Sequence, residues 1–309
     1  MSQAMPTTGV HVRAPGKLNL FFEVGPLGDD GYHDVASAYQ AVSLYEDVWA
    51  EPSDAFTIAV SGSVDVSTVP CDDRNLAVRA ARMVAREVGY RGGVHLDIVK
   101  NVPVAGGMGG GSADAAAALV AVDALLGADL GTARLLAMGA KLGADVPFAL
   151  MGGTAIGTGR GDELRPALAQ GRFEWVIVTT GDGLSTPEVY GHLDAQRDDG
   201  LAPEGREDIR DVEPGVLHAL RAGDARALAE HMRNDLQVAA LALRPELRTT
   251  IELGERSGAL AGIVSGSGPT IAFLAEDRDA ALDLQISLAA SGYAALHVHG
   301  PVHGARVLA

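Results

Sequence analysis

The sequence predicts a two-domain α+β protein. Stretches typical of strands and helices alternate irregularly along the chain, without the regular strand–helix repeat of a parallel α/β sheet. At 309 residues the chain exceeds the usual size of a single domain. Between residues 164 and 173 the composition shifts to Pro, Gln, Gly and Arg. We place the domain boundary there, which gives domains at 1–168 and 169–309.

The first domain is predicted to contain strands, helices and a hairpin. Alternating apolar residues predict the strands, and helical periodicity or alanine-rich runs next to capping residues predict the helices. The expected elements are strands at 12–24, 41–50, 56–60 and 94–99, helices at 75–88, 112–127 and 132–143, and a hairpin within 142–161 that turns at Gly152-Gly153. Pro15-Gly16 is expected to form a turn that presents Lys17, and residues 28–34 a polar loop.

The second domain is expected to begin with a strand at 174–179 and a helix capped by Ser185 or Thr186. A charged loop is expected at 198–211, two or three helices within 214–257, and a strand pair joined by glycines at 260–274. A helix that ends near 290 and a last strand at 294–299 complete the domain.

Residues 103–119 are the most distinctive stretch of the chain. Five glycines fall between Gly106 and Gly111, and an alanine-rich run follows Ser112. Glycine lets a ligand approach the backbone closely, and alanine is the strongest helix former. A flexible loop that runs into a helix presents unpaired N–H groups at the positive end of the helix dipole. We therefore predict a site for phosphate here.

The loop matches neither of two common nucleotide motifs. A Walker A loop ends in Gly-Lys-Ser/Thr, and no lysine precedes Ser112. A dinucleotide fingerprint that began at Gly107 would need glycine at position 112. The alternative to a phosphate site is a buried Ala/Gly-rich helix with a loose entry.

Composition excludes several classes of function. The net charge of −16 opposes nucleic-acid binding, which needs a basic surface. Cys71 is the only cysteine, so no internal disulfide can form, as is usual in the cytosol. The first ten residues lack the basic and apolar regions of a targeting signal, and the longest apolar run, 115–122, is too short to cross a membrane. We expect a cytoplasmic protein with no nucleic-acid or membrane partner.

Lysine is scarce in this chain, since only Lys17, Lys100 and Lys141 stand among 24 basic side chains. A lysine that persists against such a bias suggests a need for a compact ammonium group. Lys100 comes just before the glycine loop, and Lys17 belongs to another glycine-containing motif. Lys141 suits the end of a helix and needs no further role.

The residues alone leave two features open. Tyr32 and His33 could hold a flat base by stacking and hydrogen bonding, or could cover the core as ordinary loop residues. Asp145 is a lone carboxylate in an apolar setting, for which a turn or cap role is the simpler interpretation.

Three glycine-containing segments follow one another along the chain, at Ala14–Leu20, Pro103–Ala115 and Ser265–Thr270. In this order they resemble the three motifs of the GHMP small-molecule kinases, the family of galactokinases, homoserine kinases and mevalonate kinases. The resemblance covers nearly the whole chain. Further segments are similar to the corresponding segments of those family members that phosphorylate a sugar alcohol linked to cytidine diphosphate. These segments are Lys17–Asn19, Asp30–His33, Asn75–Ala81, Gly143–Pro147 and Ser185–Pro187.

The glycine loop departs slightly from the family pattern, with Met108 where leucine is common and Ala113 where a second serine often stands. Neither change removes a backbone N–H group. The resemblance implies a GHMP-kinase-like architecture with the active site in the cleft between the two domains. It implies ATP as the phosphoryl donor and Mg²⁺ as the metal.

The resemblance also implies roles for individual residues. Asp145 would be the base that takes the proton of the acceptor hydroxyl, and Lys17 would offset charge on the transferring phosphoryl group. The residues implied to bind ATP are Asn75, Lys100, Pro103, Gly106, Gly107, Met108, Gly109, Gly110, Gly111 and Ser112, and Ser112 is also the candidate metal ligand. The residues implied to bind the acceptor are Asn19, Tyr32, His33, Thr186, Pro187 and Tyr190, with His33 reading the cytosine edge.

The third motif, Gly266, Ser267 and Gly268, would close the phosphate region from the second domain. The expected partner is a small-molecule substrate with a cytidine diphosphate group, bound by a monomer or a weak homodimer. The alternatives are a homoserine or mevalonate type of kinase, a nucleotide-binding module without catalysis, and a dinucleotide-dependent oxidoreductase.

Overall fold

A computed structural model of the protein describes residues 9–180 and 183–308. The elements of its first half correspond to much of the predicted order. They are β1 (Val10–Leu27), β2 (His33–Ser53), β3 (Thr57–Gly62), α1 (Leu76–Glu87), β4 (Gly93–Lys100), α2 (Gly110–Leu126), α3 (Thr132–Ala140), α4 (Val146–Met151), β5 (Thr154–Thr158) and β6 (Glu163–Pro166).

The second half contains shorter strands and more helices. Its elements are β7 (Phe173–Val178), α5 (Thr186–Asp198), α6 (Pro214–Ala222), α7 (Ala225–His231), β8 (Arg233–Asn234), α8 (Gln237–Leu243), α9 (Glu246–Arg256), β9 (Ala261–Val264), β10 (Ile271–Ala275), α10 (Arg278–Ala290), β11 (Ala295–Gly300) and β12 (Arg306–Val307). Within the described residues 183–308, four helices occupy the region 214–257, where two or three were predicted.

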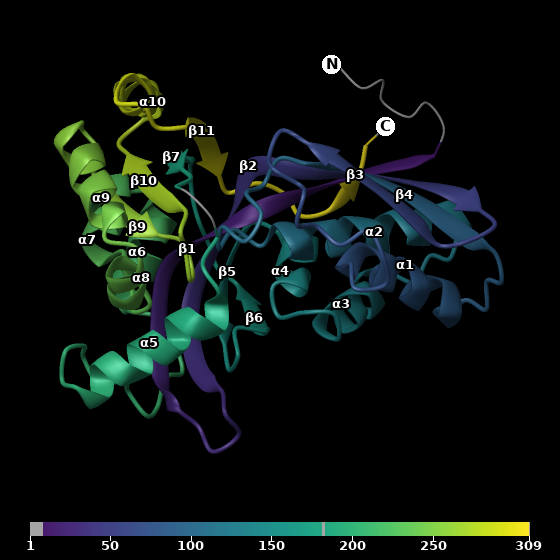
Figure 1. The fold of residues 1–309 in the computed structure, drawn as a ribbon, viewed down its shortest axis with the longest axis horizontal. Coiled ribbons are helices and arrows are strands. Elements are labelled where there is room, and N and C mark those ends of the chain that lie inside the picture. The colour runs from purple at the N-terminus through teal and green to yellow at the C-terminus, as the bar shows by residue number, and fades with distance from the viewer. Residues whose placement is uncertain (1–8, 181–182, 309) are drawn as a thin grey trace.

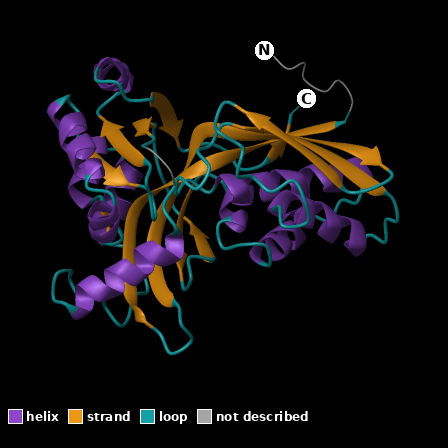
Figure 2. Ribbon diagram, viewed as in Figure 1, coloured by secondary structure: helices purple, strands orange, loops and turns teal. Residues whose placement is uncertain are grey.

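The strands of the described residues form two sheets. The larger follows the order β12-β1-β2-β4-β3, with β5 and β8 paired to its central strands and β6 to β5, and the smaller follows β11-β7-β10-β9. Figure 1 shows α1–α4 together beneath the long strands in one half, and α6–α10 around the smaller sheet in the other half. Figure 2 shows the same separation of helices and strands. Sheets and helices are mixed without a regular repeat, which confirms the α+β class.

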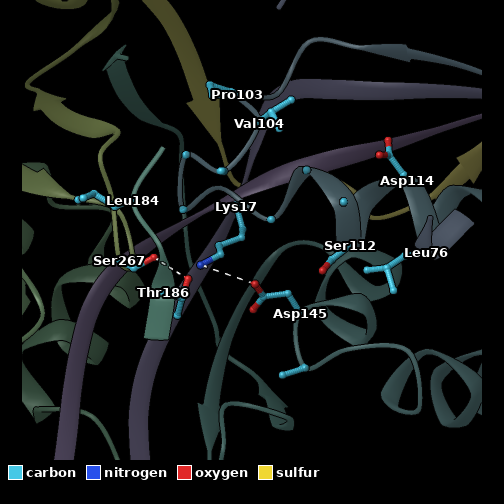
Figure 3. A pocket seen from close by; sticks show the side chains of 18 of the residues that line it. Lys17, Leu76, Pro103, Val104, Ser112, Asp114, Asp145, Leu184, Thr186 and Ser267 are labelled. Carbon is cyan, nitrogen blue, oxygen red and sulfur yellow. Dashed lines mark hydrogen bonds and ion pairs between the residues drawn. The ribbon is translucent and has the colours of Figure 1, made fainter. Parts of the chain in front are cut away.

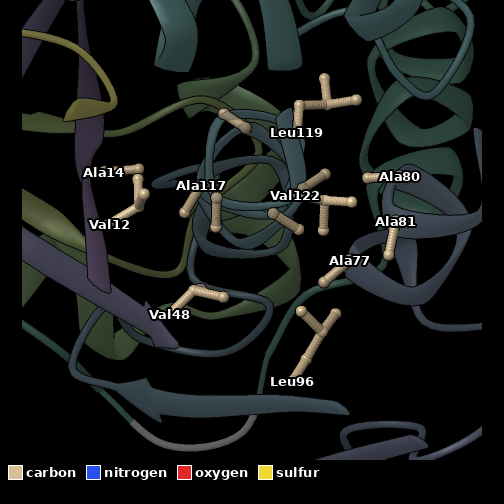
Figure 4. Close-up of a cluster of buried hydrophobic side chains, with 14 of the residues drawn as sticks. Val12, Ala14, Val48, Ala77, Ala80, Ala81, Leu96, Ala117, Leu119 and Val122 are labelled. Atoms are coloured by element: carbon tan, nitrogen blue, oxygen red, sulfur yellow. The ribbon is translucent and has the colours of Figure 1, made fainter. Parts of the chain in front are cut away.

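Helix α2 is the centre of the core in the first half. Its residues 115–119 are fully buried, and all but one of them are alanines. Figure 4 shows side chains of α2 between Val12 and Val48 of the large sheet on one side and Ala80 of α1 on the other. Small side chains allow neighbouring backbones to approach closely on several sides of the helix. The alternative to a phosphate site, a buried Ala/Gly-rich helix, thus describes the burial of α2 correctly. The glycine loop before the helix is nevertheless ordered.

The predicted ends of two helices are confirmed. Asn75 caps α1 because its side-chain oxygen accepts a hydrogen bond from the N–H of Ala77, and the chain turns at Gly89 with a φ of +69°. Gly127 ends α2 in the left-handed conformation with a φ of +57°.

The predicted turn at Pro15-Gly16 is wrong, because β1 passes through it without a break. The pairing with β2 shifts here, since Pro15 lies opposite Tyr45 whereas Gly16 lies opposite Val42. Such a bulge tolerates a proline, which cannot donate to the ladder. Lys17 is therefore a buried residue within a central strand, 8% exposed, and not the tip of a loop.

Two other boundaries also differ from prediction. Strand β2 already begins at His33, within the predicted polar loop, because β1 and β2 form a long hairpin that pairs Leu27 with His33. The predicted hairpin at Gly152-Gly153 is wrong as well. The residues before it form helix α4, and the hairpin that does occur pairs β5 with β6 around 159–162.

The predicted domain boundary at 168/169 falls between β6 and β7. Strands β8 and β12 of the second half nevertheless pair with β1, and the division at this residue stays a prediction. None of the described helices has both the length and the apolar character that a membrane crossing requires. The predicted lack of a targeting signal concerns mostly residues 1–8, which lie outside the described residues.

Candidate active site

The glycine loop, residues 103–109, connects the end of β4 to the start of α2. Gly107 and Gly109 have φ values of +77° and +71°, in the region that favours glycine. Gly109 is the N-cap of α2, and no side chain of the described residues caps this helix. The N–H groups of its first turn lack partners within the helix and are therefore suited to bind an anion.

The three glycine-containing segments meet at this loop. The N–H of Lys17 in β1 donates to the carbonyl of Met108 at 3.0 Å. On the other side, the Ser265 hydroxyl donates to the carbonyl of Gly107 at 3.2 Å. A Cβ on Gly107 would lie 2.1 Å from the carbonyl oxygen of Ser265. The close contact between the third segment and the loop thus requires glycine at position 107.

Lys17 and Asp145 face each other across the cavity below the loop. Their Nζ and Oδ2 atoms are 3.9 Å apart, and a dashed line in Figure 3 marks this ion pair. Lys17 Nζ also donates to the side-chain oxygen of Asn19 at 2.6 Å, and Asn19 Nδ2 donates to the Ser37 hydroxyl at 2.8 Å. This chain of hydrogen bonds fixes the ammonium in front of the carboxylate.

Asp145 is held at the start of the short helix α4. Pro147 lies in the first turn, where its fixed φ suits a helix and its missing N–H costs no hydrogen bond. The Asp145 side chain makes no capping hydrogen bond within the described residues and is 32% exposed. Its carboxylate is thus free to contact a ligand, and a purely capping role does not fit.

The third motif closes the cavity from the second half of the chain. The hydroxyl groups of Thr186 and Ser267 are 2.9 Å apart (Figure 3). Asn234 supports the motif from behind, because its Nδ2 donates to the carbonyls of Val264 and Gly266, both at 2.7 Å. The sequence interpretation missed Asn234, which lies in the short strand β8 within a region that was predicted to be helical.

These segments enclose a cavity of about 750 Å³ that is lined by both halves of the chain. Most of the predicted site residues line it. They are Lys17, Asn19, Asn75, Lys100, Pro103, Gly106, Gly107, Gly109, Gly110, Gly111, Ser112, Asp145, Thr186, Pro187, Tyr190, Gly266 and Ser267.

Four predicted residues lie outside the lining. The Met108 side chain is fully buried in the core, and its carbonyl is bonded to Lys17. Contact of ATP with the side chain or the carbonyl of Met108 therefore does not fit, and binding through its backbone N–H stays a prediction. Gly268, the last residue of the third motif, packs against β9, where a Cβ would be 2.8 Å from the Val264 side chain.

Tyr32 and His33 are the other two. His33 Nδ1 lies 3.0 Å from the carbonyl of Gly25, and Nε2 lies 3.3 Å from Asp194 Oδ2. Both ring nitrogens thus have protein partners, which contradicts a free edge for reading cytosine. The His33 ring instead packs behind Tyr190, with 5.1 Å between ring centroids. Tyr32 is 56% exposed outside the cavity.

Asn75 shapes the cavity wall and uses its whole side chain to do so. Its oxygen caps α1, and its Nδ2 donates to the carbonyl of Pro70 at 2.8 Å. The loop 68–76 that it holds contributes several lining residues.

Lys100 differs most from its predicted role as a cation near the nucleotide. Its Nζ donates to Glu46 Oε1 at 2.8 Å and to Asp114 Oδ2 at 2.6 Å, and the residue is only 2% exposed. Two carboxylates thus already neutralise this ammonium. The scarcity of lysine indicated that a compact ammonium was needed, but the sequence pattern did not reveal its acidic partners.

Burial and neighbouring charges shift the pKa values of Glu46, Asp114 and Lys100. Burial, together with the charge of Asp114, raises the pKa of Glu46 from 4.5 to about 8, although Lys100 acts in the opposite direction. Burial also raises the pKa of Asp114. For Lys100 burial acts downward, but the two carboxylates raise its pKa. One ammonium between two buried carboxylates favours the protonated form of one of them.

Glu46→Gln tests this raised pKa. Between about pH 4.5 and 8 the folded protein holds a proton that the unfolded chain has released, so the Glu46 contribution to stability is fully present below pH 4.5 and is lost as the pH rises toward 8. We expect the free energy of unfolding of the wild type to fall over this window relative to that of the variant. Urea denaturation at a series of pH values measures this difference. A difference that is independent of pH would contradict the raised pKa.

The sequence interpretation also missed Arg74, Arg160 and Tyr39, which line the cavity. Arg160 donates to Asp30 at 2.6 Å and lies 3.7 Å from the centroid of the Tyr32 ring. Its position between two glycines signalled a turn but gave no direction for the side chain. Tyr39 lies beneath Lys17, whose Nζ is 5.5 Å from the ring centroid.

Comparison with known proteins agrees with this geometry. The model of the GHMP kinases N terminal domain matches residues 75–153, and that of the GHMP kinases C terminal domain matches residues 216–294. Two relatives are named 4-diphosphocytidyl-2-C-methyl-D-erythritol kinase. The one from Clavibacter michiganensis subsp. michiganensis is 59% identical over 99% of both chains, and the one from Leifsonia xyli subsp. xyli is 60% identical over 97% of this chain and 98% of its own.

A solved structure leads to the same family. The crystal structure of a 4-(cytidine 5'-diphospho)-2C-methyl-D-erythritol kinase is 31% identical, covers 94% of this chain and 98% of its own, and superposes with a TM-score of 0.75. The matches span both halves of the chain and include the glycine loop and α4. This protein therefore belongs to the GHMP kinase family.

Proposed function

We propose that this protein is an ATP-dependent kinase that transfers the γ-phosphoryl group to the 2-hydroxyl of 4-diphosphocytidyl-2-C-methyl-D-erythritol. The observation that carries the chemistry is the Lys17–Asp145 pair, which lies in the same cavity as the glycine loop. The substrate assignment is supported by full-length relatives of this name at about 60% identity. This step belongs to the non-mevalonate route to isoprenoid precursors.

The pair suits transfer to an alcohol. A hydroxyl is too weak an acid to attack unaided, and the Asp145 carboxylate can orient it and accept its proton as the new bond to phosphorus forms. Lys17 lies on the phosphoryl side, where its ammonium offsets the negative charge of the transferring group. Asn19 holds Lys17 in this position through the 2.6 Å hydrogen bond.

The donor site suits ATP with a divalent cation. The N–H groups at the start of α2 are suited to the nucleotide phosphates, and loop 68–76 lines the adjoining wall. Among the described residues no group of three or more His, Cys, Asp or Glu side chains could hold a metal. Mg²⁺ suits such a site, since it commonly binds one or two protein oxygens together with substrate phosphates. Ser112 would supply such an oxygen, and the ion would neutralise charge on the nucleotide phosphates.

The acceptor pocket is formed by Asn19, Thr186, Pro187 and Tyr190, which line the cavity on the side of the second half. Tyr190 offers a ring face for a base, and His33 supports that ring from behind. This arrangement replaces the predicted reading of cytosine by a free His33 edge.

An acceptor panel tests the proposed function. ADP release is followed with purified protein, ATP and Mg²⁺ in the presence of 4-diphosphocytidyl-2-C-methyl-D-erythritol, homoserine or mevalonate. We expect turnover with the first acceptor only. Faster turnover with homoserine or mevalonate would point to another kinase of the family, and ATP binding without any transfer would point to a non-catalytic module.

A further inference from the structure

The buried charges of Glu46, Lys100 and Asp114, which we call the Lys100 cluster, have no part in the chemistry described above. We infer that the Lys100 cluster positions the first turn of α2 for the nucleotide phosphates, so that its members are positioning residues for ATP. The inference rests on the proposed function, because it assumes that ATP binds at the glycine loop.

The cluster joins three elements at the place where the loop begins and ends. Glu46 lies within β2, Lys100 is the last residue of β4, and Asp114 lies in the first turns of α2. Besides its bond to Lys100, Glu46 accepts a hydrogen bond from the N–H of Asn101 at 2.9 Å. The end of β4, from which the loop departs, and the adjacent strand β2 are therefore tied to the helix that the loop enters.

The cluster also touches the loop backbone. Asp114 follows Gly110 by four residues, which places both on one face of α2. A Cβ on Gly110 would lie 2.9 Å from Glu46 Oε1, so Glu46 packs against the backbone of that residue. Figure 3 shows Asp114 and Ser112 pointing to opposite sides of the helix start. The cluster can thus hold the helix start from the side opposite to Ser112, and its members Lys100 and Asp114 also line the cavity.

Helix α2 needs such a directional contact because its small side chains interdigitate little with those of its neighbours. Its buried face consists largely of alanines, and small side chains give little resistance to a shift or rotation of the helix against its neighbours. The loop itself is glycine-rich and imposes few backbone restraints. Hydrogen bonds of 2.6 and 2.8 Å between buried charges restrict both motions. A displacement of 1 Å at the first turn would misplace the N–H groups that bind phosphate.

Asp114→Ala tests the inference with little risk to the fold. Alanine favours the helix and matches its neighbours, and its introduction leaves Lys100 paired one-to-one with Glu46. We expect KM for ATP to rise by roughly tenfold or more, with KM for the acceptor within about twofold of the wild type. Asp114→Asn keeps one acceptor for Lys100, and we expect a smaller rise.

If Lys100 instead contacted phosphate directly, Asp114→Ala would not raise KM for ATP. Loss of Asp114 would then free the ammonium and leave KM for ATP unchanged or lower. That result, in a variant with a normal unfolding temperature, would overturn the inference. If Asp114→Ala unfolds at the assay temperature, Glu46→Gln decides, since it removes one acceptor of the cluster while keeping the size of the side chain.

Glu174→Ala is the matched control. Glu174 is also buried and also has two basic side chains as partners, Arg172 and His297, but it lies in β7 of the smaller sheet. We expect its loss to leave KM for ATP unchanged, and an equal rise in this control would show a general loss of stability instead. ATP affinities are measured by calorimetry as well, so that the inference stays testable if the acceptor of the proposed function is wrong.

Discussion

Asp145→Asn is expected to lower kcat by roughly 10²–10⁴-fold with little change in the affinity for ATP or acceptor. Asparagine keeps the size and hydrogen-bonding capacity of the side chain but cannot accept the proton of the acceptor hydroxyl. A loose transition state needs little help from a base, which would place the loss at the low end of this range. Steady-state kinetics with both substrates varied measures the effect.

The control for this variant is Asp277→Asn. Asp277 is the N-cap of α10 and accepts a hydrogen bond from the N–H of Ala280, whereas Asp145 makes no such bond to its helix in the described residues. Asparagine keeps the capping oxygen at this position, and we expect Asp277→Asn to leave kcat unchanged. Near-normal kcat in Asp145→Asn, or a loss of activity that follows unfolding alone, would support the turn interpretation of Asp145.

Lys17→Met is expected to lower kcat at the same step as Asp145→Asn. Lys17 and Asp145 lie 3.9 Å apart and would act on one step, so the double variant should be scarcely worse than the more damaging single variant. Losses in kcat that multiply in the double variant would show that the two residues act independently.

Sequence patterns predicted most of the site because its key segments combine unusual residues. The glycine loop, its alanine-rich helix and the capping residues Asn75 and Gly127 each have a local physical cause that operates within a few neighbouring residues. The fold class and the glycine loop at the start of α2 could be anticipated on this basis, and phosphate binding at that loop stays a prediction. The pairing of Lys17 with Asp145 needed the family resemblance, because the two residues are far apart in the chain.

The errors arose where a distant partner decides the structure. Pro15-Gly16 has the composition of a turn, but pairing with β2 carries the strand through it. The sequence predicts Lys100 on the nucleotide side but does not reveal its partners Glu46 and Asp114, because they come from separate elements. His33 was interpreted as a free hydrogen-bonding edge because Asp194, which binds its Nε2, lies in α5. No local pattern contains these contacts.

Gly109→Val is expected to abolish most of the activity by disturbing both ATP binding and the catalytic pair. Gly109 has a φ of +71°, which a β-branched residue rarely adopts. The structure adds a second reason, because a Cβ at this position would lie 3.2 Å from Lys17 Cγ and 3.7 Å from Asp145 Oδ2. The branched side chain would therefore push into the pair as well as distort the start of α2. We expect kcat/KM for ATP to fall by roughly 10²-fold or more.

Gly127→Val separates this local effect from backbone strain. Gly127 lies at the other end of the same helix with a φ of +57°, and a Cβ there would meet no atom of the described residues within 4 Å. Both variants thus carry a comparable strain of roughly 1–2 kcal/mol in the left-handed region, but only Gly109 adjoins Lys17 and Asp145. We expect similar unfolding temperatures for the two variants and loss of ATP affinity in Gly109→Val alone. Valine at position 109 would displace the N-cap of α2 and with it the first-turn N–H groups. Unchanged ATP affinity in a folded Gly109→Val variant would therefore exclude the glycine loop as the phosphate site.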